Sequence, residues 1–376
     1  MSVPAPIRAA CPAVPAAGQR GRAAPPRLLG VLLLTSALAL AGCATGDRSG
    51  APDDGAATDA SAAAPAPRPA EPPSEVRQAA LRKERAERAR AAEAAAAQPP
   101  SPASQTMRRY LAGIEDTLIA RGLMRTDRGD VPTDAARLVE DFVAVALRDE
   151  YERQGGALVR RVHDAPLRRW SGPVRLQLDF GASVDAATRT RDRAAVADYA
   201  ARLSQASGHP ITLTGSGGNF AVLFVSEDDR RSVGPRLARL VPGIPAADVQ
   251  AIVDLKPQNY CTVFAYSRGA APEYVRAVAV IRAELPERMR LSCIHEELAQ
   301  GLGLTNDSPA VRPSIFNDDE EFALLTRHDE LLLRILYDRR LRPGMTEAEA
   351  RPIAARIAAE LTGAPPAEPA RHSGGA

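Results

Sequence analysis

The stretch Cys293-Ile-His-Glu-Glu-Leu-Ala-Gln-Gly-Leu-Gly-Leu-Thr-Asn-Asp307 decides the fold class of this chain. Glu296 and Gln300 are four residues apart, so they share one face of the helix that we expect here. Gly303 permits a sharp turn after the helix, and Asn306 follows three residues later. The spacing therefore predicts a helix and a turn that bring three polar side chains together.

This spacing, Glu296-Glu297-x-x-Gln300-x-x-Gly303-Leu304-x-Asn306, resembles the metzincin metallopeptidase signature His-Glu-x-x-His-x-x-Gly-x-x-His. Downstream, Ser314-Ile315-Phe316 stands where such enzymes have a Ser-Ile-Met type turn below the metal, and Leu325 to Tyr337 resembles their final helix. The same pieces also resemble an uncharacterised family of bacterial secreted domains. The resemblance covers roughly 135–345 and implies a zincin-type domain whose fourth strand, here Cys261–Tyr266, is an edge that binds extended peptides.

The three ligand positions of that signature are all changed. Glu296, Gln300 and Asn306 replace the histidines, and Phe316 replaces the methionine. Zinc prefers imidazole and thiolate ligands, so zinc is not expected. Two alternatives stay open: a hard cation (calcium, magnesium or manganese) held by these oxygens with help from Asp307, or no metal, with Gln300 and Asn306 hydrogen-bonded to Glu296.

Two positions of the signature are kept, the general-base position at Glu297 and the turn glycine at Gly303. Two functions therefore compete. In the first, the domain is a non-catalytic module that binds an envelope protein or an extended peptide. In the second, it is an unorthodox hydrolase, metal-dependent or metal-free, with Glu297 as the general base.

The rest of the chain predicts an α+β domain over 105–362: a mixed sheet with the active-site-type helix, preceded by helices. Pro173 to Phe180 alternates apolar and polar residues, as a half-buried strand does. We interpret Gly215-Ser-Gly-Gly218 as a hairpin turn between two strands, because no lysine and no helix follow it as in a phosphate loop. Further strands are expected at 211–214, 220–225, 261–266 and 275–281, and helices at 107–118, 133–151, 187–206, 229–241, 246–253, 286–302, 325–337 and 346–362.

The amino-terminal segment 1–42 has the pattern of a secretory signal. Four arginines precede the apolar run Leu28–Leu40, and no acidic residue interrupts them. The run ends in Leu40-Ala-Gly-Cys43, which resembles the bacterial lipoprotein signal box and implies cleavage before Cys43 and lipidation there (a palmitate-type anchor). Because Ala44 is not Asp, the resemblance favours the outer membrane, with the domain facing the periplasm.

Residues 43–104 are expected to form a lipid-anchored tether rich in alanine and proline, because this composition cannot bury a core. Within it, 75–97 is Ala, Arg and Glu with helical charge spacing, which predicts a solvated helix. Residues 363–376 are predicted to be a disordered tail. The chain has a formal charge of +2 and no apolar run of the roughly 20 residues that a spanning helix needs, so neither nucleic acid binding nor a polytopic membrane protein is expected.

Cys261 and Cys293 would be the two cysteines left after Cys11 is removed with the signal and Cys43 is lipidated. An even pair in an oxidising compartment predicts a disulfide, which closes a loop of 32 residues and would contribute about 3.5 kcal/mol. The alternative, a metal site with His295, is weak because no further Cys or His is near.

Overall fold

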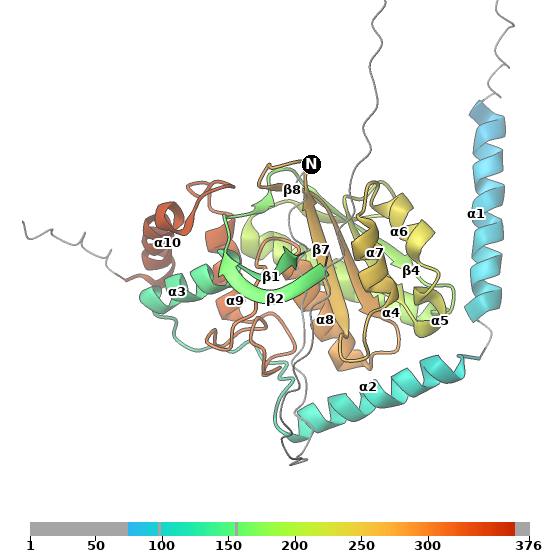
Figure 1. Ribbon diagram of the computed structural model, residues 1–376, viewed down its shortest axis with the longest axis horizontal. Coiled ribbons are helices and arrows are strands. Elements are labelled where there is room, and N and C mark those ends of the chain that lie inside the picture. Colours follow the sequence, from blue (N-terminus) through green and yellow to red (C-terminus); the bar gives the residue numbers. More distant parts are fainter. Residues whose placement is uncertain (1–73, 97–98, 155–156, 365–376) are drawn as a thin grey trace, which may run out of the picture. The chain divides into compact units, whose positions relative to one another are not determined.

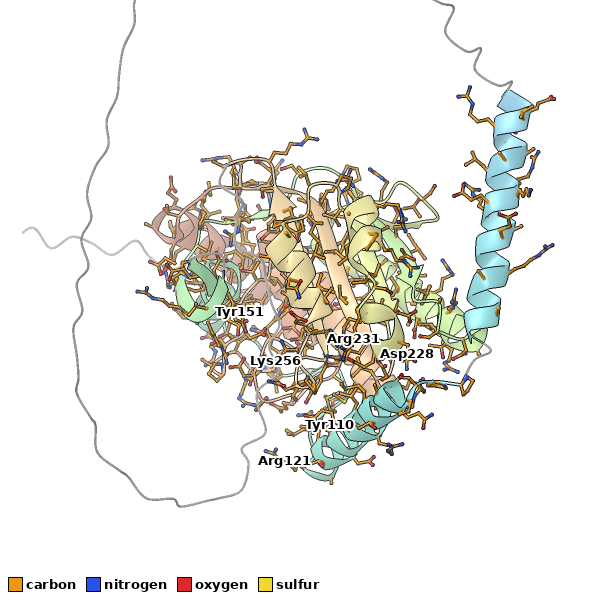
Figure 2. All side chains as sticks on the ribbon, turned by 45° about the vertical axis from the view of Figure 1, so that its right-hand side comes forward. Tyr110, Arg121, Tyr151, Asp228, Arg231 and Lys256 are labelled. Atoms are coloured by element: carbon orange, nitrogen blue, oxygen red, sulfur yellow. A yellow bond between two sulfur atoms is a disulfide. The ribbon has the colours of Figure 1, made fainter. Side chains whose placement is uncertain are left out.

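The computed structural model describes residues 74–96, 99–154 and 157–364. The signal segment 1–42, Cys43, most of the tether and the tail 365–376 lie outside the described residues. The charged helix is present as α1 (Ser74–Ala96), and side chains project from it on all sides (Figure 2). None of the helices in the described part of the chain is long and apolar enough to cross a membrane.

A mixed sheet forms the centre of the folded unit (Figure 1). Its strands are β3 (Arg169–Trp170), β4 (Val174–Phe180), β5 (Ile211–Thr214), β6 (Phe220–Val225), β7 (Cys261–Ser267) and β8 (Glu273–Arg282). The order is β3-β8-β6-β4-β5, with all these pairs parallel, and β7 adds to β8 as the antiparallel strand. The expected α+β class and the strands of the sequence pattern are therefore confirmed.

The hairpin interpretation of Gly215 to Gly218 is wrong. β5 and β6 do not pair with each other, because β4 lies between them and pairs in parallel with both. The turn instead carries the chain across the start of β4. A Cβ on Gly218 would lie 2.5 Å from the Cβ of Gln177 on β4, so glycine permits this close crossing.

Both faces of the sheet are covered. In β6, Phe220, Val222 and Phe224 face one core, and the intervening residues face a second, smaller core. The larger core contains α4 (Ala186–Ser207), α8 (Glu287–Gln300), α3 (Ala135–Ala146), α9 (Arg327–Leu336) and α10 (Glu347–Thr362). The smaller core contains α6 (Gly234–Leu240) and α7 (Ala246–Val253), which lie over the opposite face in Figure 1. A strand buried on both faces explains why β6 is apolar throughout.

The helix expected over 133–151 ends earlier, at Ala146. Its last part is a strand, β1 (Arg148–Gln154), which pairs in antiparallel register with β2 (Ala157–Asp164). Charged residues make 148–154 look helical by propensity, but the β1–β2 ladder satisfies its backbone groups instead. The signal that could have revealed this hairpin is the Gly155-Gly156 pair between the two arms.

Helix α2 (Pro102–Ala120) packs on the folded unit and supplies a polar side chain that caps another helix. Leu111 and Leu118 are buried in the core, and the Glu115 carboxylate accepts a hydrogen bond of 2.8 Å from the backbone N–H of Met289. That N–H belongs to the first turn of α8, whose N-cap, Pro286, offers no side-chain acceptor. Glu115 therefore caps α8 from another helix.

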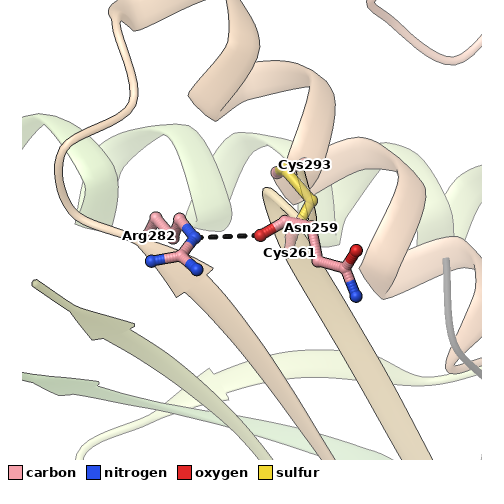
Figure 3. Close-up of a disulfide and its surroundings, with 4 residues drawn as sticks. All are labelled: Asn259, Cys261, Arg282 and Cys293. Carbon is pink, nitrogen blue, oxygen red and sulfur yellow. Dashed lines mark hydrogen bonds between the residues drawn. A yellow bond between two sulfur atoms is a disulfide. The ribbon is translucent and has the colours of Figure 1, made fainter. Parts of the chain in front are cut away.

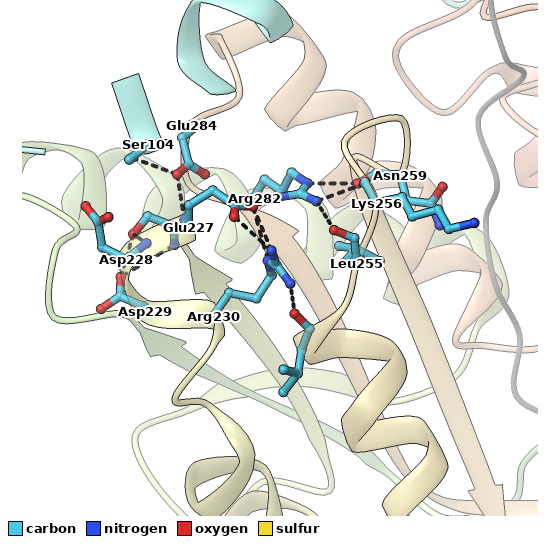
Figure 4. A network of polar contacts seen from close by, with 12 residues as sticks. Ser104, Glu227, Asp228, Asp229, Arg230, Leu255, Lys256, Asn259, Arg282 and Glu284 are labelled. Carbon is cyan, nitrogen blue, oxygen red and sulfur yellow. Dashed lines mark hydrogen bonds and ion pairs between the residues drawn. The ribbon is translucent and has the colours of Figure 1, made fainter. Parts of the chain in front are cut away.

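A buried ionic network ties the end of β8 to its neighbours (Figure 4). Arg282 pairs with Glu227 of α5 (Glu227–Arg230), and Arg230 pairs with the same carboxylate at 2.8 Å. Glu284 accepts from the Glu227 backbone N–H and from the Ser104 hydroxyl of α2, both at 2.7 Å. Arg282 also donates to the carbonyls of Leu255, Lys256 and Asn259.

The expected disulfide is confirmed. Cys261 at the start of β7 and Cys293 in α8 are joined across a Cα–Cα distance of 5.9 Å (Figure 3). Both cysteines are buried. The bond fixes α8 against β7, the antiparallel strand of the sheet.

Candidate functional site

Helix α8 presents the polar residues that the sequence singled out and ends at a tightly constrained turn. Gly303 has φ +125°, and a Cβ there would lie 2.3 Å from the carbonyl oxygen of Arg168. Glycine is therefore required at this turn, because it adopts this backbone conformation at low cost and leaves room for the Arg168 carbonyl. The turn directs the chain back toward α8 through Asn306 and Asp307.

Four carboxyl groups gather beside this turn, and we refer to Glu150, Glu296, Glu297 and Asp307 as the carboxyl cluster. Glu297 is fully buried, and the exposed fractions of Glu150, Asp307 and Glu296 are 2%, 7% and 9%. Three of the four were expected from the sequence. Glu150, on the unexpected strand β1, was missed because its segment was interpreted as a helix end.

The two amide side chains hold the returning chain in place. Gln300 Nε2 donates to Asp307 Oδ1 at 2.9 Å, and Asn306 Nδ2 donates to the carbonyl of Ala144 at 2.8 Å. The alternative in which both amides hydrogen-bond to Glu296 is not seen, because their nitrogens donate to other partners. Both amides therefore hold separate segments of the chain together through their nitrogens.

Several buried acceptor oxygens of the site have no hydrogen-bond donor among the described residues. They include both carboxyl oxygens of Glu297, Oε1 of Gln300 and Oδ1 of Asn306. Buried acceptors without a donor are costly, so this arrangement calls for protons on the carboxyl groups or for a bound positive group.

All four carboxyl groups of the cluster have raised pKa values, and burial is the main cause. It raises the pKa of Glu297 well above its usual range, and the charges of Asp307 and Glu150 add to the effect. Burial, together with the same neighbouring carboxyls, also raises the pKa of Glu296. The pKa of Glu150 is raised to about 9 by burial and by Asp307, and that of Asp307 to about 8 by burial and by Asp318. Near neutral pH the cluster therefore retains protons.

One cation lies beside the cluster, on the β1–β2 hairpin. Arg160 of β2 is 2.9 Å from Glu150 and 3.1 Å from Asp318, through different guanidinium nitrogens. Its side chain is half exposed, so it lies at the margin of the cluster. These contacts attach the β1–β2 hairpin to the segment that follows Asp307, because Asp318 belongs to that segment and forms an ion pair with Arg160.

The Ser314-Ile315-Phe316 turn is anchored by Asp329 of α9. The Asp329 carboxylate accepts from the Ser314 hydroxyl at 2.5 Å and from the Ile315 N–H at 3.2 Å. The same carboxylate closes the capping box with Thr326 at the start of α9. Phe316, at the position of the metzincin methionine, is fully buried, so this turn is a packed element of the core.

His295 is a packing residue. Its ring stacks on Tyr199 at 3.8 Å between centroids, and its Nδ1 accepts from the backbone N–H of Leu325 at 2.9 Å. Burial lowers its pKa to about 3, so it remains neutral. The ring face and Nδ1 are both used structurally, which argues against His295 as a metal ligand.

The donor set does not fit zinc. The positions equivalent to the metzincin ligands, Glu296, Gln300 and Asn306, offer oxygens only, and both amide nitrogens are engaged. Oxygen donors suit a hard cation better. Within the described ranges, however, no three His, Cys, Asp or Glu side chains are grouped to hold a metal ion.

Comparison with known proteins identifies one family model, described as "Protein of unknown function (DUF2927)", which matches residues 135–356. The match spans β1, the carboxyl cluster, the sheet and α9, and it covers more than half of the chain. No curated protein and no solved structure matches the chain.

Proposed function

Because the chain belongs to the DUF2927 family of proteins of unknown function, we propose that it is a lipid-anchored envelope protein whose domain binds an extended peptide or protein segment without cleaving it. The observation that carries the proposal is that side chains at the positions of the metzincin metal ligands and general base serve the packing of the chain. Gln300 and Asn306 tie the chain together through their amides, and Glu297, at the general-base position, is fully buried. A general base must reach water or substrate, and a protonated, enclosed carboxyl does neither.

The strand order supports the zincin-type resemblance from which this proposal starts. The order β5-β4-β6-β8 is parallel, and β7, the strand expected as the peptide-binding edge, is antiparallel and pairs with β8 alone among the described strands. An edge strand offers backbone groups that an extended peptide can pair with. The disulfide from Cys261 holds this strand on α8.

The anchor belongs to the same proposal. The run Leu28–Leu40 and the box ending at Cys43 would place the protein at the outer membrane, with the domain in the periplasm at the end of the tether. Its partners would then be the membrane, through the lipid, and an envelope protein or peptide.

A second candidate is the unorthodox hydrolase. One observation favours it: both oxygens of Glu297 and Oε1 of Gln300 are buried without a hydrogen-bond donor among the described residues. Groups that bind a substrate or a cation are expected to have such unpaired oxygens in the free protein. In that case Glu297 would act as the general base once a substrate or a hard cation entered the cluster.

The substitution Glu297→Gln separates the two candidates. A library of quenched fluorescent peptides is incubated with the full chain after loading with zinc, calcium or manganese, and both cleavage and binding are measured. We expect no cleavage that depends on Glu297, and equal peptide binding by the wild type and Glu297→Gln. Glu287→Gln, an exposed carboxylate at the start of the same helix, is the matched control. Cleavage that Glu297→Gln abolishes and Glu287→Gln retains would overturn the binding proposal in favour of the hydrolase.

A further inference from the structure

A second site, which shares no residue with the carboxyl cluster, is a cavity of about 570 Å³ lined by residues of α4, α9 and α10 and by Arg128. Four arginines line it, and we call it the arginine pocket: Arg128, Arg202, Arg327 and Arg334. They come from a loop, from α4 and from both ends of α9. No part of the function proposed above uses this pocket.

Three of the arginines converge on a single acid. Glu330 is 2.9 Å from Arg128, 2.9 Å from Arg202 and 3.0 Å from Arg327, through nitrogens of the three guanidinium groups. Arg202 also donates to the carbonyl of Leu325 at 2.6 Å, and Glu330 itself is buried. Shared contacts of this kind hold guanidinium groups in place before any ligand arrives, which lowers the entropic cost of binding.

The charges in the arginine pocket are not balanced. Four guanidinium groups face one carboxylate, which leaves a formal charge of +3 at the lining. Arg334 is exposed and has no acidic partner among the described residues. Asp198, one turn before Arg202 on α4, does not line the cavity. A concave surface with an uncompensated positive charge attracts anions.

We propose that the arginine pocket binds the phosphate group of an organic phosphate. Guanidinium groups bind phosphate through paired hydrogen bonds, and a phosphate monoester carries up to two negative charges, which suits the surplus of three better than a carboxylate does. A water molecule occupies about 30 Å³ in the liquid, so the cavity has room for more than a phosphate ion. Leu331 and Leu361 add an apolar lining for the organic part. This chemistry is shared by soluble phosphate esters and by phospholipid headgroups.

Calorimetric titration of the full chain at low salt tests the proposal. The probes are glycerol 3-phosphate, dihexanoyl phosphatidic acid below its micelle concentration, and glycerol as the probe without phosphate. We expect at least one phosphate probe to bind and glycerol not to bind. The double variant Arg327→Gln/Arg334→Gln should bind at least about tenfold more weakly, since hydrogen bonds to charged groups are lost. Binding of the lipid analogue alone would assign the site to a headgroup, and equal binding of both phosphates to a soluble ester.

Two further variants exclude trivial explanations. Arg191→Gln/Arg339→Gln removes the same charge from exposed arginines outside the pocket and should bind like the wild type. Glu330→Gln removes the negative charge that competes for three guanidinium groups but keeps an amide oxygen that accepts their hydrogen bonds. The guanidinium groups therefore stay ordered and this variant should bind the phosphate more tightly, an effect that damage to the fold would not produce. Failure of the wild type to bind either phosphate probe, or an equal loss in the Arg191→Gln/Arg339→Gln control, would overturn the proposal.

Discussion

Replacing Glu150 by glutamine is expected to stabilise the protein at neutral pH. Glu150 is buried on β1, and its pKa is raised to about 9 by burial and by Asp307, although Arg160 opposes the rise. In the unfolded chain the same carboxyl has the model value 4.5. The native state therefore holds a proton that the unfolded state releases above pH 4.5, and this favours unfolding progressively as the pH rises toward 9.

The size of the effect follows from the interval between the two pKa values. Each pH unit above 4.5 costs the native state about 1.4 kcal/mol, so one group costs about 3 kcal/mol at pH 7. Glutamine has nearly the same shape and no proton to lose. We therefore expect Glu150→Gln to match the wild type near pH 4 and to exceed its unfolding free energy by about 3 kcal/mol at pH 7.

Urea unfolding followed by circular dichroism between pH 4 and pH 8 measures this difference. Glu152→Gln is the matched control, because Glu152 lies on the same strand, is partly exposed and pairs with Arg161 at 3.2 Å. The control should change stability by no more than about 0.5 kcal/mol at any pH. If Glu150→Gln is less stable than the wild type at pH 7, Glu150 is ionised there and its contact with Arg160 dominates, and the reasoning from burial is refuted.

Two further predictions concern the frame of the site. Replacing both Cys261 and Cys293 by alanine should lower the unfolding free energy by about 3.5 kcal/mol, the value for a closed loop of 32 residues, and thiol counting on the unreduced protein should find neither residue free. Gly303→Ala should destabilise by at least about 1–3 kcal/mol, because the new Cβ requires an unfavourable φ and meets a backbone oxygen at 2.3 Å. Gly215→Ala, at a position with nothing within 4 Å, should leave the urea midpoint nearly unchanged; equal effects of the two glycine substitutions would contradict this account.

The sequence alone determined the elements whose local pattern agrees with their final environment. The alternation in 173–180 and the helix expected at 187–206 appear in the structure as β4 and α4. The parity of the cysteines predicted the bond between Cys261 and Cys293. The spacing from Glu296 to Asp307 likewise predicted a helix, a glycine turn and a return, because these depend on residues close together in the chain.

Only the tertiary structure decided which strands are neighbours and what completes the site. The Gly215–Gly218 turn looks like a hairpin locally, but β4 lies between the strands that it joins, and pairing between distant segments is not encoded in a turn. Glu150 joins the carboxyl cluster from a segment that is charged and helix-like by propensity, since strand pairing with β2 overrides that propensity. Burial of several carboxyl groups around Glu297, and the resulting rise in their pKa, depends on that long-range packing, so no spacing along the chain could have revealed it.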